Sequence, residues 1–444
     1  MEIIWSIKMR NAFIVEKCIC FNVCTFINIL LKEKKNRHYM KFFYFLIILL
    51  FTVSFSKASE KVNLDEKWKT IISQGSNKVV NFHAWGGSKN INNYINWVSV
   101  KVKNKYGINL KHVKIKDTSQ AVKKVLYEKL SKKNKDGSID IIWINGENFS
   151  SMLENNLLYY KNWIYELPNS KNIDLRVNSI LMYDFGIFNQ GKEMPWGLSQ
   201  LIYFYDSAKI LNPPRNAVEF KEYVVRNPGR VTFPQPPDFT GTSFLKQILI
   251  EITQDKQKLK EKFNFNKHAY ILDGLWSWLD FVTPYLWKQG KSYPKNYVGL
   301  AQLLSDDEVD VAMSFNISFP SNEVTKKNLP LTTKSYISTE GSLSNVHYLA
   351  IPYNATNPSG SKLVIDYMIS PEAQLRKEDH KFWGDPNVLS FSKLEQRWKE
   401  KFNKLSSGPA MIKKANLEKK IQEPHPSWVK EIEENWIKRY GSIN

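Results

Sequence analysis

The chain has 444 residues and a formal net charge of +20, with 63 Lys and Arg against 43 Asp and Glu. Only nine of the basic residues are Arg, and the Lys residues are spread along the chain. Nucleic-acid sites concentrate Arg in a patch for bidentate contacts, so we expect no nucleic-acid partner. The three cysteines, Cys18, Cys20 and Cys24, all lie near the N-terminus, which excludes disulfides and Cys-based zinc or nucleophile chemistry from the rest of the chain.

The N-terminal region has the pattern of an export signal. Met40 is followed by Lys41, an apolar run and a small-x-small cleavage site before Ser59. The run is too short for a comfortable membrane span, so we expect a signal peptide at 40–58 and an upstream extension at 1–39. No Cys follows the run, which argues against a lipid anchor and predicts a protein secreted into the periplasm of a Gram-negative bacterium.

An alternative interpretation makes Met1 the true start. The segment 18–31 would then be a short membrane-embedded leader.

Strands and helices alternate over the first part of the remaining chain. We expect strands at 79–84, 108–116 and 138–144 and helices at 90–106 and 117–131. This order predicts a parallel sheet with right-handed crossovers, in which ligands bind at the carboxyl ends of the strands.

Three polar or aromatic turns follow those strand ends. The first offers an indole face, two glycines that permit close backbone approach, and a hydroxyl at a helix start. The third has the parts of a polar clamp. The alternative is that these are ordinary strand-to-helix turns with capping residues. The candidate ligand-lining residues in them are Trp85, Gly86, Gly87, Ser88, Asn145, Glu147 and Asn148.

The pattern changes after about residue 190, where a second α/β unit begins. Pro195–Leu211 contains an apolar strand, and Asp238–Ser243 opens a helix with hydroxyls and amides that suit a ligand or plain capping. Short strands at 310–315 and 346–351 follow. Further candidate site residues here are Trp196, Asp238, Thr240, Thr242, Trp287, Asn316 and Trp383.

The order of these elements resembles that of bacterial periplasmic solute-binding proteins of the maltose-binding class. Five motifs resemble more narrowly the YnjB-type family of ABC-importer solute-binding proteins within extracellular solute-binding protein family 1. They are FHAWGGS at 82–88, LKHVK at 110–114, DIIWINGENF at 140–149, PPDFTGT at 236–242 and EPHPSW at 423–428.

The resemblance implies an α/β fold of two lobes, each a mainly parallel sheet flanked by helices and joined by crossing hinge strands. The first lobe would comprise 59–200 and, with the return crossing, 319–370. The second lobe would comprise 201–318, and 371–444 would be a helical region packing on it. The implied role is to deliver a solute to a membrane permease of an ABC importer.

The residues favour a binding role over catalysis. The indoles together with Glu147, Asp206, Asp238 and Asp385 suit a cationic or flat heterocyclic organic solute, and they also suit a sugar stacked on indole rings. The alternative function is a secreted glycosidase-like hydrolase in which Glu147 and Asp385 form a carboxylate pair. We expect a monomer with no enzymatic activity, cofactor or metal, because the histidines are dispersed and no nucleophile or phosphate-binding motif occurs.

Overall fold

The computed structural model describes residues 65–177, 179–406, 408–412 and 419–441. The expected upstream extension, signal peptide, cleavage site and alternative leader lie outside the described residues. Within the described part of the chain, no helix is both long enough and apolar enough to cross a membrane.

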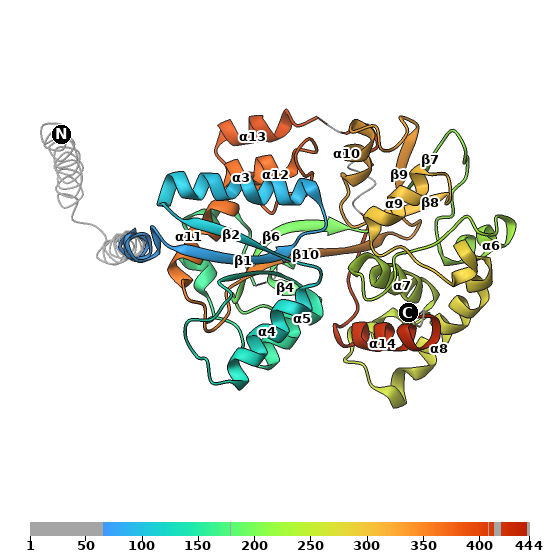
Figure 1. Ribbon diagram of the computed structural model, residues 1–444, viewed down its shortest axis with the longest axis horizontal. Helices are drawn as coiled ribbons and strands as arrows, with labels where there is room; N and C mark the ends of the chain where they lie inside the picture. Colours follow the sequence, from blue (N-terminus) through green and yellow to red (C-terminus); the bar gives the residue numbers. More distant parts are fainter. Residues whose placement is uncertain (1–64, 178, 407, 413–418, 442–444) are drawn as a thin grey trace, which may run out of the picture. The chain divides into compact units, whose positions relative to one another are not determined.

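The first lobe is built on a six-stranded sheet (Figure 1). The strand order is β11-β10-β3-β1-β2, and β6 also pairs with β10. β1 is parallel to both β2 and β3, as the alternating pattern predicts, whereas β10 is antiparallel to β3 and β6. The strands are β1 (Val79–Trp85), β2 (Asn109–Ile115), β3 (Ile141–Ile144), β6 (Glu193–Gln200), β10 (Ser342–Ala350) and β11 (Lys420–Ile421).

Helices cover both faces of this sheet. In Figure 1, α3 and α12 lie on one side of it, and α4 and α5 lie on the other. α3 turns an apolar stripe, from Ile91 to Val102, into the core and ends at Gly107, whose φ of 70° favours glycine. The helices of this lobe are α3 (Lys89–Tyr106), α4 (Thr118–Leu130), α5 (Gly146–Glu154), α11 (Pro358–Met368), α12 (Pro371–Glu378) and α13 (Gln396–Asn403).

The second lobe has its own hydrophobic core and a three-stranded sheet in the order β8-β7-β9. Its strands are β7 (Ile202–Asp206), β8 (Val311–Ser314) and β9 (Thr333–Tyr336), and its helices are α6 (Ala217–Arg226), α7 (Phe239–Ile252), α8 (Phe265–Val282), α9 (Tyr297–Ser305), α10 (Phe319–Thr325) and α14 (Ser427–Tyr440).

The sheet of the second lobe differs from the expected parallel arrangement. β7 is antiparallel to both of its neighbours. The sheet's only parallel pairing among the described residues is an isolated bridge between Val231 and Val311. The physical reason is that β7 enters from the first lobe in one direction, while β8 and β9 run back toward the crossing strands.

Three passages of the chain connect the lobes. β6 runs directly into β7, and β10 returns antiparallel to β6, with Leu201 N–H donating to the Leu343 carbonyl at 2.8 Å. The third passage runs from α13 to α14, and on its way β11 pairs in parallel with β10.

We expected the C-terminal region, 371–444, to pack on the second lobe alone. In the structure it divides between the two lobes. Phe402 of α13 and Trp383 lie in the first core, whereas Trp428 and Trp436 of α14 lie in the second. α12 packs on α11 and α13 packs on α12 before the chain crosses, and α14 packs on α7 in the second lobe (Figure 1).

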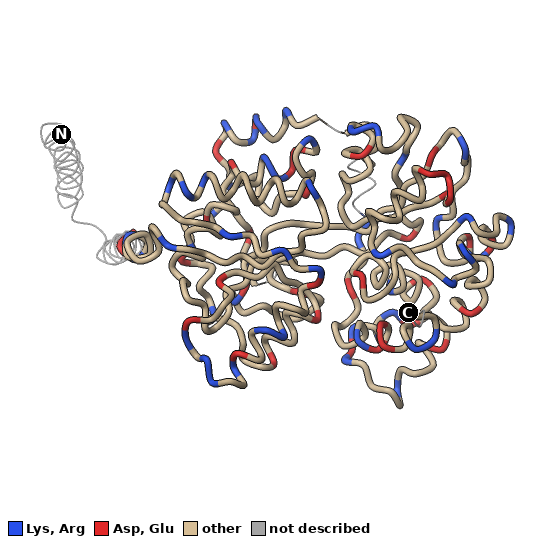
Figure 2. Tube along the Cα trace, viewed as in Figure 1, with Lys and Arg blue, Asp and Glu red and all other residues tan. Residues whose placement is uncertain are grey.

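Lys and Arg positions are distributed over both lobes, without one dominant basic cluster (Figure 2). This distribution is consistent with a solvated, Lys-rich surface.

Candidate functional site

The turns that follow β1, β2 and β3 meet at one edge of the first sheet. Gly86 N–H donates to the Ile115 carbonyl at 3.1 Å, and the Thr118 hydroxyl donates to the Trp143 carbonyl at 3.3 Å. These bonds join each turn to the end of a neighbouring strand. The predicted convergence of three strand ends is therefore present in the structure.

The capping interpretation holds for one of these turns. Asp117 caps α4, because its carboxylate accepts from Ser119 N–H at 2.7 Å. Ser88 and Asn145 occupy cap positions too, but neither side chain makes a capping hydrogen bond. The capping interpretation therefore does not account for these two side chains.

Gly146 places the third turn against the first lobe's short hairpin, β4 (Tyr183–Asp184) and β5 (Ile187–Phe188). Its φ is 61°, and an added Cβ would lie 2.7 Å from the ring of Phe185. Gly146 N–H donates to Asp184 at 2.8 Å, and Glu147 accepts from the Asn148 side chain at 2.6 Å. Gly146 therefore lets the ring of Phe185 pack closely against the turn that carries Glu147.

The second lobe presents the start of α7 at the same boundary. Asp238 caps this helix by accepting from Thr240 and Gly241 N–H at 2.9 and 3.2 Å, so the capping interpretation applies here. An added Cβ on Gly241 would lie 1.9 Å from the Pro234 carbonyl oxygen. The Thr242 hydroxyl donates to Glu433 of α14 at 2.7 Å.

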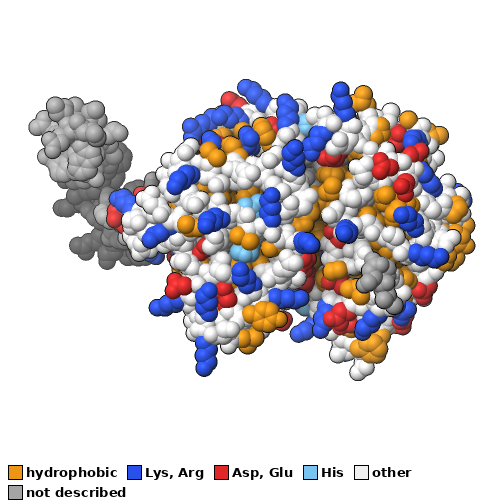
Figure 3. Space-filling view, in the orientation of Figure 1, with side chains coloured by type: hydrophobic (Ala, Val, Ile, Leu, Met, Phe, Trp, Pro, Cys, Tyr) orange, Lys and Arg blue, Asp and Glu red, His pale blue; other side chains and the backbone are white. Residues whose placement is uncertain are grey.

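Side chains from the two lobes touch across the boundary. The rings of Trp85 and Tyr297 have centroids 5.7 Å apart at an interplanar angle of 32°, and Trp85 packs against both hydrophobic cores. Ser88 lies close enough to the Tyr297 hydroxyl to lower its pKa, although burial, the larger effect, raises that pKa overall. The ammonium of Lys246 lies 4.7 Å from the centroid of Phe185. Figure 3 shows hydrophobic side chains along the boundary on the face it draws.

Lys246 forms a buried ion pair with Glu423, which lies on the third passage of the chain between the lobes. Its ammonium donates to Glu423 at 2.7 Å, and both side chains are only 2% exposed. The second oxygen of Glu423 accepts from Asn345 of β10 at 3.1 Å. This cluster therefore ties α7, the crossing strand and the C-terminal segment together.

Several carboxyl groups near this pair hold protons more tightly than usual. Burial raises the pKa of Glu147 and of Asp238 to about 7, although Lys246 opposes the shift at Glu147. Burial, reinforced by the charges of Glu147 and Asp117, raises the pKa of Glu433 to about 8. Acidic groups of both lobes are thus held in an environment that disfavours their charge.

Three of the predicted site residues, all of them Trp, lie elsewhere, and the part of Asn316 in solute binding stays a prediction. Trp196 and Trp383 are almost fully buried in the first core, where each packs edge-on against Trp143. Trp287 lies in the second lobe, and its indole N–H donates to Glu308 at 2.6 Å. Asn316 accepts from Ser318 N–H at 3.0 Å and shapes the turn before α10.

Two carboxylates expected to face a solute have other partners. Asp385 is buried and bound by Lys377 and His347. Burial would raise the pKa of Asp385, but His347 and Lys377 together lower it below its usual value. Asp206, at the end of the central strand β7 of the second lobe's sheet, accepts from the Thr332 hydroxyl at 2.5 Å.

The sequence reasoning missed Tyr297, Lys246 and Glu433. Lys246 carried a usable signal, because it is the one charged residue in the mostly apolar stretch 244–250 of a buried helix. Glu433 and Tyr297 carried none, since their roles depend on contacts with distant segments.

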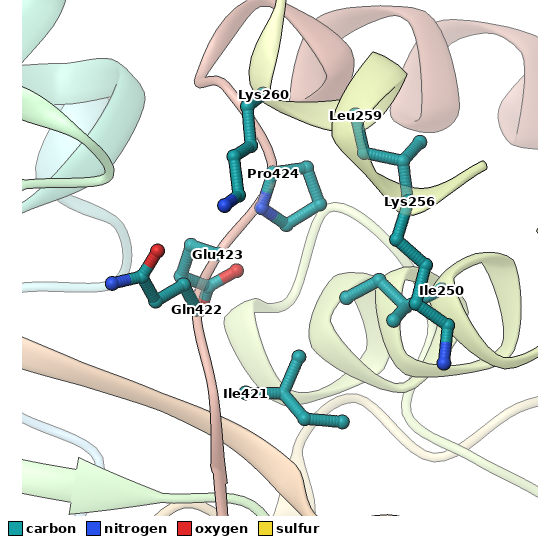
Figure 4. A pocket seen from close by; sticks show the side chains of 8 residues that line it. All are labelled: Ile250, Lys256, Leu259, Lys260, Ile421, Gln422, Glu423 and Pro424. Carbon is teal, nitrogen blue, oxygen red and sulfur yellow. The ribbon is translucent and has the colours of Figure 1, made fainter.

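A cavity of about 150 Å³ lies between the end of α7, the segment 256–260 and the C-terminal segment that carries Glu423 (Figure 4). The residues that line it are Ile250, Lys256, Leu259, Lys260, Ile421, Gln422, Glu423 and Pro424. In the part of the chain that the structure describes, no group of three or more His, Cys, Asp or Glu is arranged to hold a metal ion.

Comparisons with known proteins agree with this architecture. Residues 98–401 match the family model described as bacterial extracellular solute-binding protein. The chain is 37% identical over 375 residues to Protein YnjB of Escherichia coli K12, covering 84% of this chain and 94% of that protein.

Two solved structures are similar in fold. One is the periplasmic binding protein AfuA from Actinobacillus pleuropneumoniae with fructose-6-phosphate bound, at a TM-score of 0.57 and 13% identity, covering 82% of this chain and 98% of that chain. The other is described as a spermidine/putrescine ABC transporter from Listeria monocytogenes, at a TM-score of 0.57 and 17% identity, covering 82% and 99%. The resemblance inferred from the sequence motifs, and with it the two-lobed fold, is confirmed.

Proposed function

Because this chain belongs to the bacterial extracellular solute-binding proteins, we propose that it is the solute-capturing component of an ABC importer. It holds a small solute between its two lobes and delivers it to a membrane permease. The periplasm is the compartment in which such a protein meets both its solute and its permease.

The observation that carries this proposal is that the second lobe contacts the edge of the first sheet where β1, β2 and β3 end, which is the edge at which we predict the solute to bind. Trp85 and Ser88, at the carboxyl end of β1, touch Tyr297 of the opposite lobe. In α/β sheets, ligands bind at this end of the strands. Bending at the crossing strands would open and close the site, and only a solute that binds the closed form better can drive closure.

The glycosidase-like alternative is less well supported. It requires Glu147 and Asp385 to act as a pair, and inverting or retaining enzymes hold such groups about 5–10 Å apart. Asp385 is instead paired with Lys377 and hydrogen-bonded to His347, and it is buried in the first lobe. Binding without turnover is the function that the geometry supports best.

A thermal-shift screen of the mature chain tests the proposal. Amines, heterocycles, sugars, oxyanions and metal ions are added after partial unfolding has removed any carried-over solute. We expect a saturable rise in melting temperature with one class, and recovery of that compound unchanged. Trp85→Ala should abolish the rise, whereas Trp398→Ala, on the outer helix α13, should retain it. Turnover of a panel compound would overturn the proposal in favour of an enzyme.

A further inference from the structure

The lobes also contact each other through α10 of the second lobe and the turn 383–384 of the first. The side-chain amide of Asn322, on α10, donates to the Trp383 carbonyl at 2.9 Å, and this hydrogen bond is buried. Trp383 belongs to the first hydrophobic core, whereas Phe319 and Val324 of α10 belong to the second. The hydrogen bond therefore joins the two lobes directly, in addition to the strands that cross between them.

Gly384 brings the backbones of the two lobes close together at this contact. Its φ is 88°, and an added Cβ would lie 2.1 Å from the Ser318 Cβ and 2.4 Å from the Ser318 hydroxyl oxygen. Ser318 directly precedes α10 and is buried, so the second lobe packs on this glycine without an intervening side chain. A methyl group at position 384 would fit only if Ser318, and with it the start of α10, moved away from the first lobe.

The turn that carries Gly384 is fixed firmly within the first lobe. The backbone N–H groups of Gly384 and Asp385 both donate to the Lys377 carbonyl, at 2.8 and 3.0 Å. Lys377 lies on α12, and its ammonium also donates to the Pro386 carbonyl at 2.8 Å. A group added at position 384 would therefore press on α10 of the second lobe, because its own turn is held on both sides.

α10 also packs against the side chain that meets the predicted solute edge. The ring of Phe319 lies edge-on against Tyr297, with centroids 4.8 Å apart and an interplanar angle of 89°. Tyr297 in turn lies 5.7 Å from Trp85 of the first lobe, again measured between ring centroids. A shift of α10 relative to the first lobe would thus reach the Trp85–Tyr297 contact through a single intervening side chain.

We propose that the Asn322–Trp383 hydrogen bond and the Gly384–Ser318 packing form a latch that stabilises this arrangement of the lobes without help from a solute. The proposal rests on the solute-capturing function proposed above and describes how closure at that site is regulated. A solute shifts the balance of two arrangements only by its differential affinity for them, so a contact made by the protein alone sets the starting point of that balance. Loosening the latch lowers the population of this arrangement and leaves the predicted solute edge chemically unchanged.

Pulsed electron–electron double resonance on the solute-free mature chain tests this inference. The chain from Ser59 onward contains no cysteine, so nitroxide labels can be attached at Lys123→Cys and Lys267→Cys without removing a native thiol. Both positions are exposed, on α4 of the first lobe and α8 of the second. The readout is the fraction of molecules whose labels lie at the separation that this arrangement of the lobes gives.

Four variants separate the latch from local strain. Asn322→Ala removes the hydrogen bond and Gly384→Ala adds the wedging methyl group, so each should lower the ratio of this arrangement to more open ones about fivefold, the net effect of one hydrogen bond. Ser318→Gly removes the two atoms nearest to the new methyl group, so Gly384→Ala/Ser318→Gly should restore the wild-type distances. Gly229→Ala is the matched control, because its φ is 80° but no atom lies within 4 Å of an added Cβ.

Circular dichroism verifies that each variant is folded, and Asn322→Ala decides the outcome if Gly384→Ala does not fold. Label distances in Asn322→Ala and Gly384→Ala that match those of Gly229→Ala would overturn the latch. A double variant no closer to the wild type than Gly384→Ala would also overturn it, because backbone strain at position 384 would then be the cause. No solute enters these measurements, so the latch can fail while the solute screen succeeds, and the screen can fail while the latch holds.

Discussion

The buried Lys246–Glu423 pair gives the sharpest prediction about what holds the second lobe to the crossing strands. Lys246→Met keeps the length and apolar character of the side chain but removes its charge. Glu423 would then retain only the 3.1 Å hydrogen bond from Asn345 while buried near Glu147 and Asp184. Removing one member of a buried ion pair leaves an uncompensated charge, which typically destabilises a protein by about 3–5 kcal/mol.

The double variant Lys246→Met/Glu423→Gln removes that uncompensated charge. We therefore expect it to recover most of the lost stability, because replacing both members of a buried pair is often close to neutral. Urea unfolding followed by tryptophan fluorescence measures the free energy of unfolding by linear extrapolation.

Lys256→Met is the matched control. Lys256 binds Glu340 at 2.8 Å, nearly the same distance, but the two side chains are 46% and 58% exposed. An exposed pair contributes at most about 1 kcal/mol. If Lys246→Met proves no more destabilising than Lys256→Met, or if the double variant is no more stable than Lys246→Met, the buried unpaired charge of Glu423 is not the cause of the destabilisation.

Two further predictions concern pH and the first core. Burial gives Glu147 and Glu433 folded-state pKa values of about 7 and 8, above the usual value of 4.5, so the solute-free protein should become more stable as pH falls from about 8 towards 4.5; pH-dependent melting measures this, and a melting temperature that does not rise over that window would contradict the assignment. Gly197→Ala would place a Cβ 1.8 Å from His347 Nε2 and 2.1 Å from the Asp385 carboxylate. We therefore expect the free energy of unfolding to fall by about 3 kcal/mol or more. A melting temperature like that of the wild type would show that the surrounding side chains can move aside.

The sequence predicted best where structure depends on local pattern. The alternation of β1, α3, β2, α4 and β3 followed from hydrophobic periodicity and from glycine and cap residues at their ends. The convergence of the three turns then followed from parallel pairing alone.

Predictions failed where they depended on distant partners. Trp196 and Trp383 resemble Trp85 in standing next to a glycine, but Gly197 makes room for His347 and Gly384 for Ser318, not for a solute. The Thr242–Glu433 contact joins residues 191 positions apart, and no local pattern encodes it. The antiparallel second sheet likewise depends on how crossing strands enter it.

The third passage of the chain has a consequence for how a reporter could be built into this protein. Two helices that adjoin it, α13 and α14, belong to opposite lobes although they are close in sequence. A fluorescent donor on an outward residue of α13 and an acceptor on α14 would therefore change separation when the lobes rotate, with both labels in the last part of the chain. Such a pair would make solute capture visible as an optical signal without a change in the rest of the polypeptide.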